Sequence, residues 1–320
     1  MKSLLKLISG LLLLSIVSRA PAEPKPAPVV QATPLPYHRV SFERNGSEIT
    51  RSHFGTDLKR PFLYPVIGPS GRPLTRMGHP HDPVSHSHHN SVWLSHAKVN
   101  DVDFWGDTGK GRIVHQRLEK LTDGDDDASA TTFNLWIDEG KHRTLLAERR
   151  RIRVIPKDGG AALILIDSQF EAKTDVVFGK TPFGFVGVRM AKNIGVRDGG
   201  GTIRNSAGGI DEKGVFWKPA KWVDYSGAVT RDVKRLEGIA LFDHPKNPNH
   251  PSVFHVRNDG WMGASFSFAA PVELAQGKTL RLRYGLYVHA TLDAAALDAR
   301  WNDFAKGDLD DLSPKPAGPK

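Results

Sequence analysis

Short runs of β-branched and aromatic residues, broken by glycine, proline, asparagine or aspartate, dominate this chain of 320 residues. Such runs are typical of strands, and the breakers are typical of the turns between them. Only residues 292–304 have a clear helical pattern, so the chain must build its core mainly from sheets. The strand-like runs are 131–137, 161–170, 239–242, 252–256, 261–268 and 279–288.

One helix is expected near the C-terminus, over residues 292–304. Alanine is frequent there, and Leu297, Trp301 and Phe304 fall on one side of the helix. We find no internal repeat and no second linker within residues 37–312. The sequence therefore predicts an all-β protein, a large antiparallel β-sandwich formed by a single domain over residues 37–312, with one C-terminal helix.

Residues 1–22 have the features of a secretory signal peptide. Lys2 and Lys6 precede a mostly apolar stretch over residues 7–17, and Ala20-Pro21-Ala22 matches the small-x-small pattern of a cleavage site. This stretch is too short for a spanning helix, and no later segment reaches about 18 unbroken apolar residues. We therefore expect cleavage near Ala22, a periplasmic or secreted protein, and no membrane span.

Two segments outside the expected domain are rich in proline. Residues 23–36 are predicted to be a Pro-rich linker, and residues 313–320 a disordered tail. The acidic segment 123–127 lacks the spaced ligands of a calcium loop, so it is expected to be a polar hairpin tip.

The composition excludes several classes of function. The chain has no cysteine, which removes disulfides, haem attachment and thiolate metal sites. The net charge of +9 is dispersed, apart from Arg149-Arg150-Arg151, which is expected to form a solvated strand face. An exported chain without a basic patch interleaved with aromatic residues is not expected to bind nucleic acid.

Histidines are dense between residues 79 and 115, which hold seven of the 14 in the chain. Positions two apart on a strand share a face, so a pair of histidines could present two imidazoles to one ligand. Three interpretations remain open: catalysis or substrate binding, a divalent metal held as in a cupin, or a structural role. A cupin would usually add a glutamate, and none occurs over residues 79–117. The candidates are His88 and His89 for catalysis, and His79, His81 and His86 for a metal.

A second group of candidates lies in a glycine-rich region over residues 205–225. Aromatic faces stack on pyranose rings, and carboxylates accept hydrogen bonds from sugar hydroxyls. A carboxylate among tryptophans could also act as a general base, although each of these residues could equally belong to the core or the surface. The candidates are Glu212 for catalysis, and Trp217, Trp222 and Asp224 for sugar binding.

A third group lies toward the C-terminus. His255 and Arg257 are two residues apart on a predicted strand and share a face, which suits a site for an anionic or enolate-like group. His289 follows a long apolar strand, where a lone histidine is often structural. The chain has no serine nucleophile elbow, which favours proton transfer over acyl transfer. The candidates are His255 and His289 for acid–base catalysis, and His244 and Arg257 for substrate binding.

The blocks 60–66, 68–71, 86–96, 99–105, 203–206, 222–227 and 238–245 span most of the chain. Together they resemble a family of exported bacterial proteins of unknown function, often labelled PmoA-like after a methane oxygenase subunit. The family's histidine block typically reads Asp-His-Pro-His-His-Arg-Ser, and Ser85, Ser87 and Asn90 replace its Asp, Pro and Arg here. This departure implies altered specificity or reduced activity.

The methane oxygenase label does not fit, because such a subunit needs membrane helices. The resemblance implies instead a sandwich similar to galactose mutarotase and its sugar-active relatives, which commonly accompany polysaccharide breakdown. We therefore expect a protein that acts on a sugar or oligosaccharide by acid–base proton transfer, as an epimerase, lyase or hydrolase. Two alternatives remain, a non-catalytic carbohydrate-binding protein and a cupin-type metal enzyme. No cofactor other than a divalent metal is expected.

Overall fold

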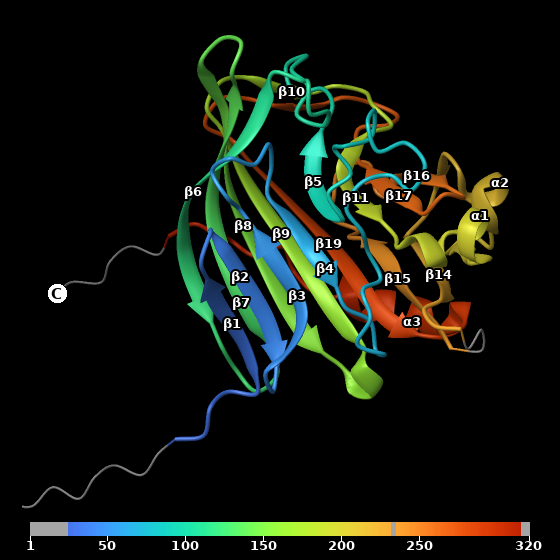
Figure 1. The fold of residues 1–320 in the computed structure, drawn as a ribbon. Helices are drawn as coiled ribbons and strands as arrows, with labels where there is room; N and C mark the ends of the chain where they lie inside the picture. Colours follow the sequence, from blue (N-terminus) through green and yellow to red (C-terminus); the bar gives the residue numbers. More distant parts are fainter. Residues whose placement is uncertain (1–24, 232–234, 315–320) are drawn as a thin grey trace, which may run out of the picture.

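The computed structural model describes residues 25–231 and 235–314, and two large antiparallel sheets dominate it (Figure 1). Within these residues, one sheet has nine strands in the order β1-β2-β3-β4-β5-β11-β17-β16-β13. Its strands are β1 Val30–Leu35, β2 Arg39–Arg44, β3 Ser47–His53, β4 Phe62–Val66, β5 Val92–His96, β11 Gly184–Arg189, β13 Lys218–Pro219, β16 Val253–Arg257 and β17 Trp261–Ser265.

The second sheet has eight strands within the same described residues, in the order β12-β14-β15-β19-β9-β8-β7-β6. The expectation of an all-β antiparallel sandwich is therefore confirmed. The eight strands are β6 Gly111–Thr122, β7 Ala128–Asp138, β8 Arg143–Pro156, β9 Ala162–Ala172, β12 Thr202–Asn205, β14 Trp222–Ala228, β15 Leu236–Asp243 and β19 Thr279–Ala290, while β10 Val176–Phe178 and β18 Val272–Leu274 pair separately.

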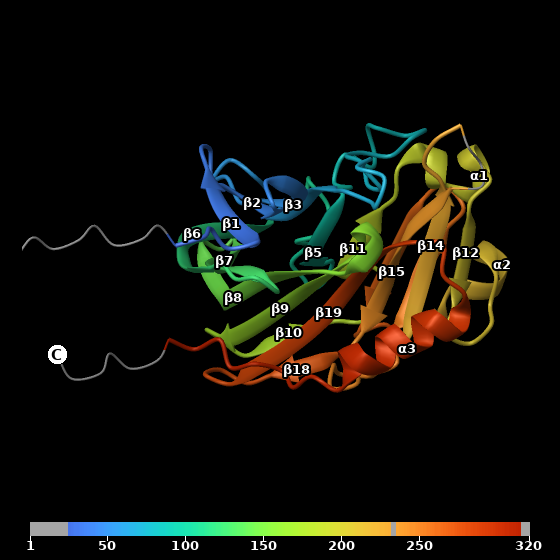
Figure 2. The same cartoon turned by 90° about the horizontal axis from the view of Figure 1, so that it is seen from below.

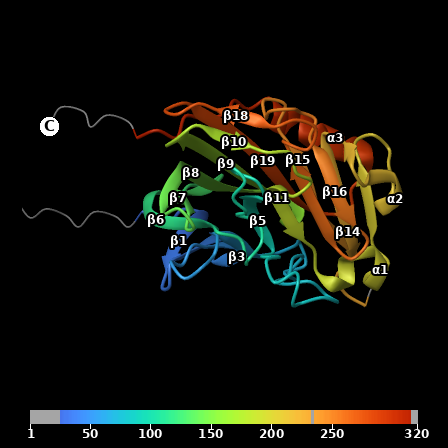
Figure 3. The ribbon, with the colours of Figure 1, turned by 90° about the horizontal axis from the view of Figure 1, so that it is seen from above.

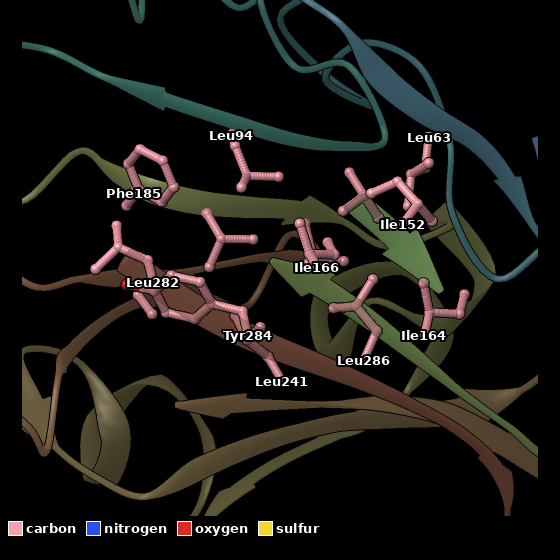
Figure 4. Packing of buried hydrophobic residues seen from close by; sticks show 14 of the residues in the cluster. Leu63, Leu94, Ile152, Ile164, Ile166, Phe185, Leu241, Leu282, Tyr284 and Leu286 are labelled. Carbon is pink, nitrogen blue, oxygen red and sulfur yellow. The ribbon is translucent and has the colours of Figure 1, made fainter. Parts of the chain in front are cut away.

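The main hydrophobic core lies between the two sheets (Figure 4). Leu94 and Phe185 of the nine-stranded sheet meet Ile166 and Leu286 of the eight-stranded sheet there. Side chains alternate along a strand, so each strand that fills this core also presents every second residue on its other face. Those outer faces are available for a helix or for a site.

The inner face of β8 carries a buried ion pair as well as apolar residues. The Arg150 guanidinium lies 2.7 Å from a carboxylate oxygen of Glu148, and Trp136 Nε1 donates to the same carboxylate over 2.9 Å. The expectation of a solvated face for the whole arginine run was therefore wrong for Arg150. The alternation of β8 turns this residue inward, where a buried charge requires a partner.

The helix α3, Ala294–Ala305, covers part of the outer face of the eight-stranded sheet (Figure 2). The Asp293 side chain caps its first turn by accepting from the Ala296 amide. As expected, Leu297, Trp301 and Phe304 are its buried residues, and they pack on a cluster from β9, β14, β15 and β19.

The structure also contains very short helical segments that the sequence pattern did not predict. Each lasts five residues or fewer, which is too short to show a helical period. They are α1 Val196–Gly199, α2 Asp211–Val215 and the 3₁₀ turns Asp158–Gly160 and Lys192–Ile194.

The expectation that residues 23–36 form a linker was wrong in part, because β1 occupies Val30–Leu35. This strand pairs with β2 and buries the side chains of Val30 and Ala32. Pro34 is tolerated because β1 is an edge strand, where a missing N–H need not break a ladder. Proline content alone therefore misled the boundary of the folded part.

The acidic segment 123–127 joins β6 to β7, as the expected hairpin tip does. Its aspartates also hold β1 in place, because Asp123 accepts from the Ala32 amide over 2.7 Å and Asp125 accepts from the Val29 amide over 3.3 Å. Val30 and Gly124 exchange backbone hydrogen bonds at the same point. The tip of one sheet is thus attached to the edge of the other.

The expected signal peptide lies outside the described residues, as do residues 315–320 of the expected tail. At the described end of the chain, Gln169 donates to the Ser313 hydroxyl and accepts from the Leu312 amide. No helix in the described part of the chain is long and apolar enough to cross a membrane.

The inter-sheet core leads to a first prediction. Phe185→Ala should lower the free energy of unfolding by about 3–5 kcal/mol, because it removes a fully buried ring from between the sheets. Phe183→Ala is a matched control, since Phe183 is 41% exposed and its loss should cost much less. Urea unfolding of both variants measures the difference, and equal losses would contradict this packing.

Candidate functional site

A cavity of about 550 Å³ opens on the outer face of the nine-stranded sheet. Its floor comes from the central strands β11, β17 and β16, and loops between strands form its walls. The longest of these loops, over residues 67–91, lies on the opposite side of the molecule from α3 (Figure 3). The lining residues are His79, His86, His88, His89, Ala97, Asp103, Trp105, Gly106, Phe183, Arg189, His255, Arg257, Asp259 and Trp261.

Two glycines make room for the aromatic floor of this cavity. Gly187 of β11 and Gly263 of β17 are neighbours in the sheet, and the indole of Trp261 lies against both. A Cβ atom on Gly187 would lie 2.7 Å from Trp261 Cη2, and one on Gly263 would lie 2.8 Å from Trp261 Cζ2. Only glycine lets the ring approach the backbone this closely. Trp93 and Trp105 complete this aromatic cluster.

A buried arginine connects the loop over residues 67–91, called the histidine loop below, to the turn after β16. Arg189, 1% exposed, donates from Nε to His89 Nδ1 over 3.1 Å and from Nη1 to Asp259 Oδ1 over 2.8 Å. Arginine can only donate, so Nδ1 of His89 carries no proton and Nε2 carries it. Burial, and then the charge of Arg189, lower the pKa of His89 well below its usual range. His89 is therefore a neutral imidazole with its N–H on Nε2.

His79 is fixed in the same network. Its Nε2 lies 2.9 Å from Asp259 Oδ2, and its Nδ1 accepts from the amides of His81 and Asp82. Since Nδ1 is an acceptor, Nε2 must be the donor to Asp259. His79 therefore holds the loop to Asp259 and does not offer a free nitrogen to a ligand.

The other two histidines considered for a metal also have carboxylate partners. His81 Nε2 lies 2.8 Å from Asp198 Oδ1, and His86 Nδ1 lies 2.9 Å from Asp82 Oδ2. His81 does not line the cavity, whereas His86 does. Across residues 25–231 and 235–314, no three His, Asp or Glu side chains are grouped so that they could hold a metal ion.

His88 and His255 are the two cavity histidines whose rings make no hydrogen bond within the described residues. Burial is the main cause that lowers the pKa of each to about 4, with Arg60 adding to the effect at His88 and Arg257 at His255. His255 Nδ1 is fully buried without a hydrogen-bond partner. Both rings are therefore neutral near pH 7 and able to accept a proton.

A second buried arginine sets the position of His88. Arg60 donates to the carbonyls of Phe104 and Gly106 over 3.3 and 3.2 Å, and to Asn90 Oδ1 over 2.8 Å. It also donates to the His88 carbonyl over 3.5 Å. One guanidinium thus ties the histidine loop to the loop that carries Trp105, and this fixes two walls of the cavity relative to each other.

The structure brings six of the sequence candidates together at the cavity. Four are the candidates for catalysis or substrate binding His88, His89, His255 and Arg257, and two are the metal candidates His79 and His86. Glu212 lies behind Arg257 rather than in the cavity. One of its carboxylate oxygens accepts from the Asn258 amide over 2.8 Å, and the other lies 3.3 Å from Arg257 Nε. Trp217 is 48% exposed and stacks on Phe216 with ring centroids 4.5 Å apart, also outside the cavity lining.

The remaining candidates are buried elsewhere and do not line this cavity. Asp224 and His289 pair with each other over 3.0 Å in the eight-stranded sheet. Trp222 packs beneath α3, and its Nε1 donates to Asp298. His244 is likewise tied to the chain, with Nε2 2.8 Å from the Gly307 carbonyl. In each case a polar group in the interior has found a partner within the fold.

Sequence reasoning missed the residues that organise the cavity. Arg189 and His89 are 100 positions apart, and Arg189 and Asp259 are 70 apart, so no local spacing relates them. Trp105 lies in one of the family blocks, and Trp261 begins a predicted strand, which are the only signals that pointed to them. The lining residues not predicted as site residues are Ala97, Asp103, Trp105, Gly106, Phe183, Arg189, Asp259 and Trp261.

Fold and site together define a β-sandwich protein with an aromatic, histidine-rich cavity on the outer face of one sheet. The chain belongs to a family of unknown function, DUF6807, whose model matches residues 39–302. Comparison with curated proteins gives no match. The PmoA-like label is not part of this finding and stays an expectation from the sequence.

Among solved structures, the chain is similar to a mutant of the heparan sulfate lyase HepC from Pedobacter heparinus, with 11% identity and a TM-score of 0.43 over 85% of this chain. It spans only 38% of the lyase. A GalM/aldose epimerase homologue from C. elegans is 7% identical, with a TM-score of 0.33 over 83% of this chain and 99% of its own. A galactose mutarotase related enzyme from Lactobacillus acidophilus is 10% identical, with a TM-score of 0.30 over 79% of this chain and 92% of its own.

The Arg189 contact predicts the protonation state of His89. In ¹⁵N–¹H NMR spectra of the histidine rings, Nδ1 of His89 should have the shift of an unprotonated nitrogen and Nε2 that of a protonated one. Because the pKa of His89 is lowered, neither shift should change between pH 5 and 8. The His89→Gln spectrum assigns the signals, and a proton on Nδ1 would contradict the network.

Burial of His88 and His255 predicts a pH dependence of stability. Each pKa falls from 6.5 in the unfolded chain to about 4 in the fold, so between these values the unfolded chain binds more protons. The free energy of unfolding should therefore fall as the pH drops from 6.5 to 4. Urea unfolding measured at several pH values across this range gives the slope of the free energy of unfolding against pH. This slope should be shallower for His255→Gln than for the wild type.

His142→Gln, at an exposed turn, is the matched control for this experiment and should keep the wild-type slope. An unchanged slope in His255→Gln would show that His255 does not contribute to the pH dependence.

Proposed function

We propose that this protein is an exported carbohydrate-active enzyme that moves a proton on a sugar or oligosaccharide. One observation carries the proposal. His88 and His255 face one cavity, and neither ring is hydrogen-bonded to the described part of the chain. Two neutral imidazoles that share a cavity can act as base and acid on opposite sides of a bound molecule.

His89 has a different role from His88 and His255 in this proposal. Its Nδ1 is occupied by Arg189, so His89 cannot serve as a base there. Its Nε2–H instead donates a hydrogen bond to an oxygen of the substrate, where negative charge develops as a proton leaves carbon. His88 is the favoured base, because its ring centroid lies 4.6 Å from that of His89. Base and donor can thus act on neighbouring atoms.

The carboxylates of the cavity favour proton transfer at carbon over glycoside hydrolysis. A typical glycosidase needs two carboxyl groups that face the scissile bond. Asp259 is held by Arg189 and His79, and Asp103 accepts from the amides of Trp105 and Gly106 over 2.7 and 3.1 Å. Both are committed to the protein, so an epimerase or a lyase fits these residues better than a hydrolase.

The size and walls of the cavity suit a sugar. A cavity of about 550 Å³ lies within the ordinary range for small-ligand sites. Trp105, Trp261 and Phe183 give it apolar ring surface, which packs well on the C–H faces of pyranoses. Histidine and arginine N–H groups can then bind the hydroxyls at the rim.

Export remains a proposal supported by the sequence of residues 1–22, which lie outside the described part of the chain. The charged, apolar and small-residue regions occur there in the order of a signal peptide. A periplasmic or secreted location would place the protein where oligosaccharides from polysaccharide breakdown are found.

The base role of His88 gives a direct test. With a panel of oligosaccharides in D₂O, mass spectrometry should detect deuterium on carbon, or an eliminated product, for the wild-type protein. For the substrate so identified, His88→Gln should lower kcat/KM by about 10²–10⁴-fold, the usual contribution of a general base. His142→Gln, at an exposed turn, is the control and should keep full turnover.

Two results would count against this proposal. Full turnover by His88→Gln would remove the base role. Saturable sugar binding by the wild type without any product would favour the carbohydrate-binding alternative. In that alternative, the exposed Trp217, stacked on Phe216, offers a surface for a sugar. Trp217→Ala should then reduce binding, whereas His88→Gln should not.

A further inference from the structure

The charged side chains that line the cavity differ in how many of their donor or acceptor groups are hydrogen-bonded to the protein. Arg189, Asp259 and Asp103 all make short hydrogen bonds to the protein. Arg257 is different. Its side chain is 50% exposed, and its one ion pair joins Nε to Glu212 over 3.3 Å. Its two terminal NH₂ groups make no hydrogen bond within the described residues, so a paired set of donors remains free at the cavity.

The fold holds this guanidinium in a defined orientation. The alternation of β16 places Arg257 on the same face as His255, next to the cavity. Its guanidinium carbon lies 5.6 Å from the ring centroid of Phe216. Glu212, which binds Nε, is itself anchored by the Asn258 amide over 2.8 Å. Phe216 and Glu212 therefore hold the guanidinium in place, and its two terminal NH₂ groups remain free to donate.

From these contacts we infer that the substrate bound at this site carries an oxyanion, such as the carboxylate of a uronic acid or a sulfate ester, which binds to the free edge of Arg257. This inference rests on the proposed function and names its substrate class. A guanidinium binds an oxyanion through two parallel N–H···O bonds, and this geometry gives both affinity and orientation.

The other groups of the cavity agree with an anionic ligand. The two lining carboxylates already accept hydrogen bonds from the protein, so they are poor acceptors for sugar hydroxyls. Donors remain on His89 Nε2 and on Arg257. Arg257 is also the second cause of the lowered pKa of His255. An oxyanion at Arg257 would offset that charge and make His255 a better proton acceptor when the substrate is bound.

The test compares three probes that differ in one substituent: glucose, glucuronate and glucose 6-sulfate. NMR titrations of the full chain should give a Kd about tenfold or more lower for at least one anionic probe than for glucose, because a charge-assisted pair is added. The carboxylate and sulfate arms identify which oxyanion the site prefers. Raising the salt concentration should weaken the preference for the anionic probe, because the ion pair between Arg257 and the oxyanion is partly exposed to solvent.

Variants then test whether Arg257 causes the preference for the anionic probe. Arg257→Gln should lose the preference, so that its Kd for the anionic probe rises to about its Kd for glucose. Arg257→Lys should keep part of the preference, because the charge remains and the paired donors are lost. Arg39→Gln, on β2 at the far end of the nine-stranded sheet from β16, is the matched control and should keep the full preference. Thermal unfolding checks that all three variants are folded.

The outcomes separate this inference from the proposed function. If glucose and the anionic probes bind equally, or if Arg257→Gln keeps the preference, the oxyanion inference is wrong while sugar binding stands. If none of the three probes binds to the wild-type protein, both are overturned.

Discussion

The bridge that Arg189 makes between His89 and Asp259 is the interaction on which the site depends. A buried guanidinium is costly unless every contact it loses to water is replaced, so its partners must stay in place. Here those partners come from the histidine loop and from the turn after β16, which are far apart in the chain. The need to satisfy one charge therefore fixes two walls of the cavity and the tautomer of His89.

The rest of the site combines a rigid floor with loops that are fixed from beneath. The floor consists of hydrogen-bonded strands whose inner faces fill the core, so it cannot move without disturbing the sandwich. The loops lack such a ladder, and Arg60 replaces it by joining several of their backbone carbonyls. This arrangement explains how histidines on an irregular segment keep fixed positions at the cavity.

The sequence was informative where a feature is local. Strand runs and turns led to the β-sandwich, and helical spacing led to α3. The period of two predicted that His255 and Arg257 share a face, and both line the cavity. Features set by tertiary contacts were not accessible in this way. Asp224 and His289 look functional in the sequence, yet they hydrogen-bond to each other in the interior. Arg189 gave no signal, because its importance comes only from partners that the fold brings to it.

The attachment of β1 to the 123–127 hairpin also affects how copies of this protein meet. An edge strand with free backbone groups can pair with the edge of another molecule and begin aggregation. The hairpin occupies the amides of Val29, Val30 and Ala32, so this stretch of the edge is already capped by its own chain. A truncated chain that began at residue 37, the boundary that composition suggested, would lack β1. It would expose β2 as a new, uncapped edge.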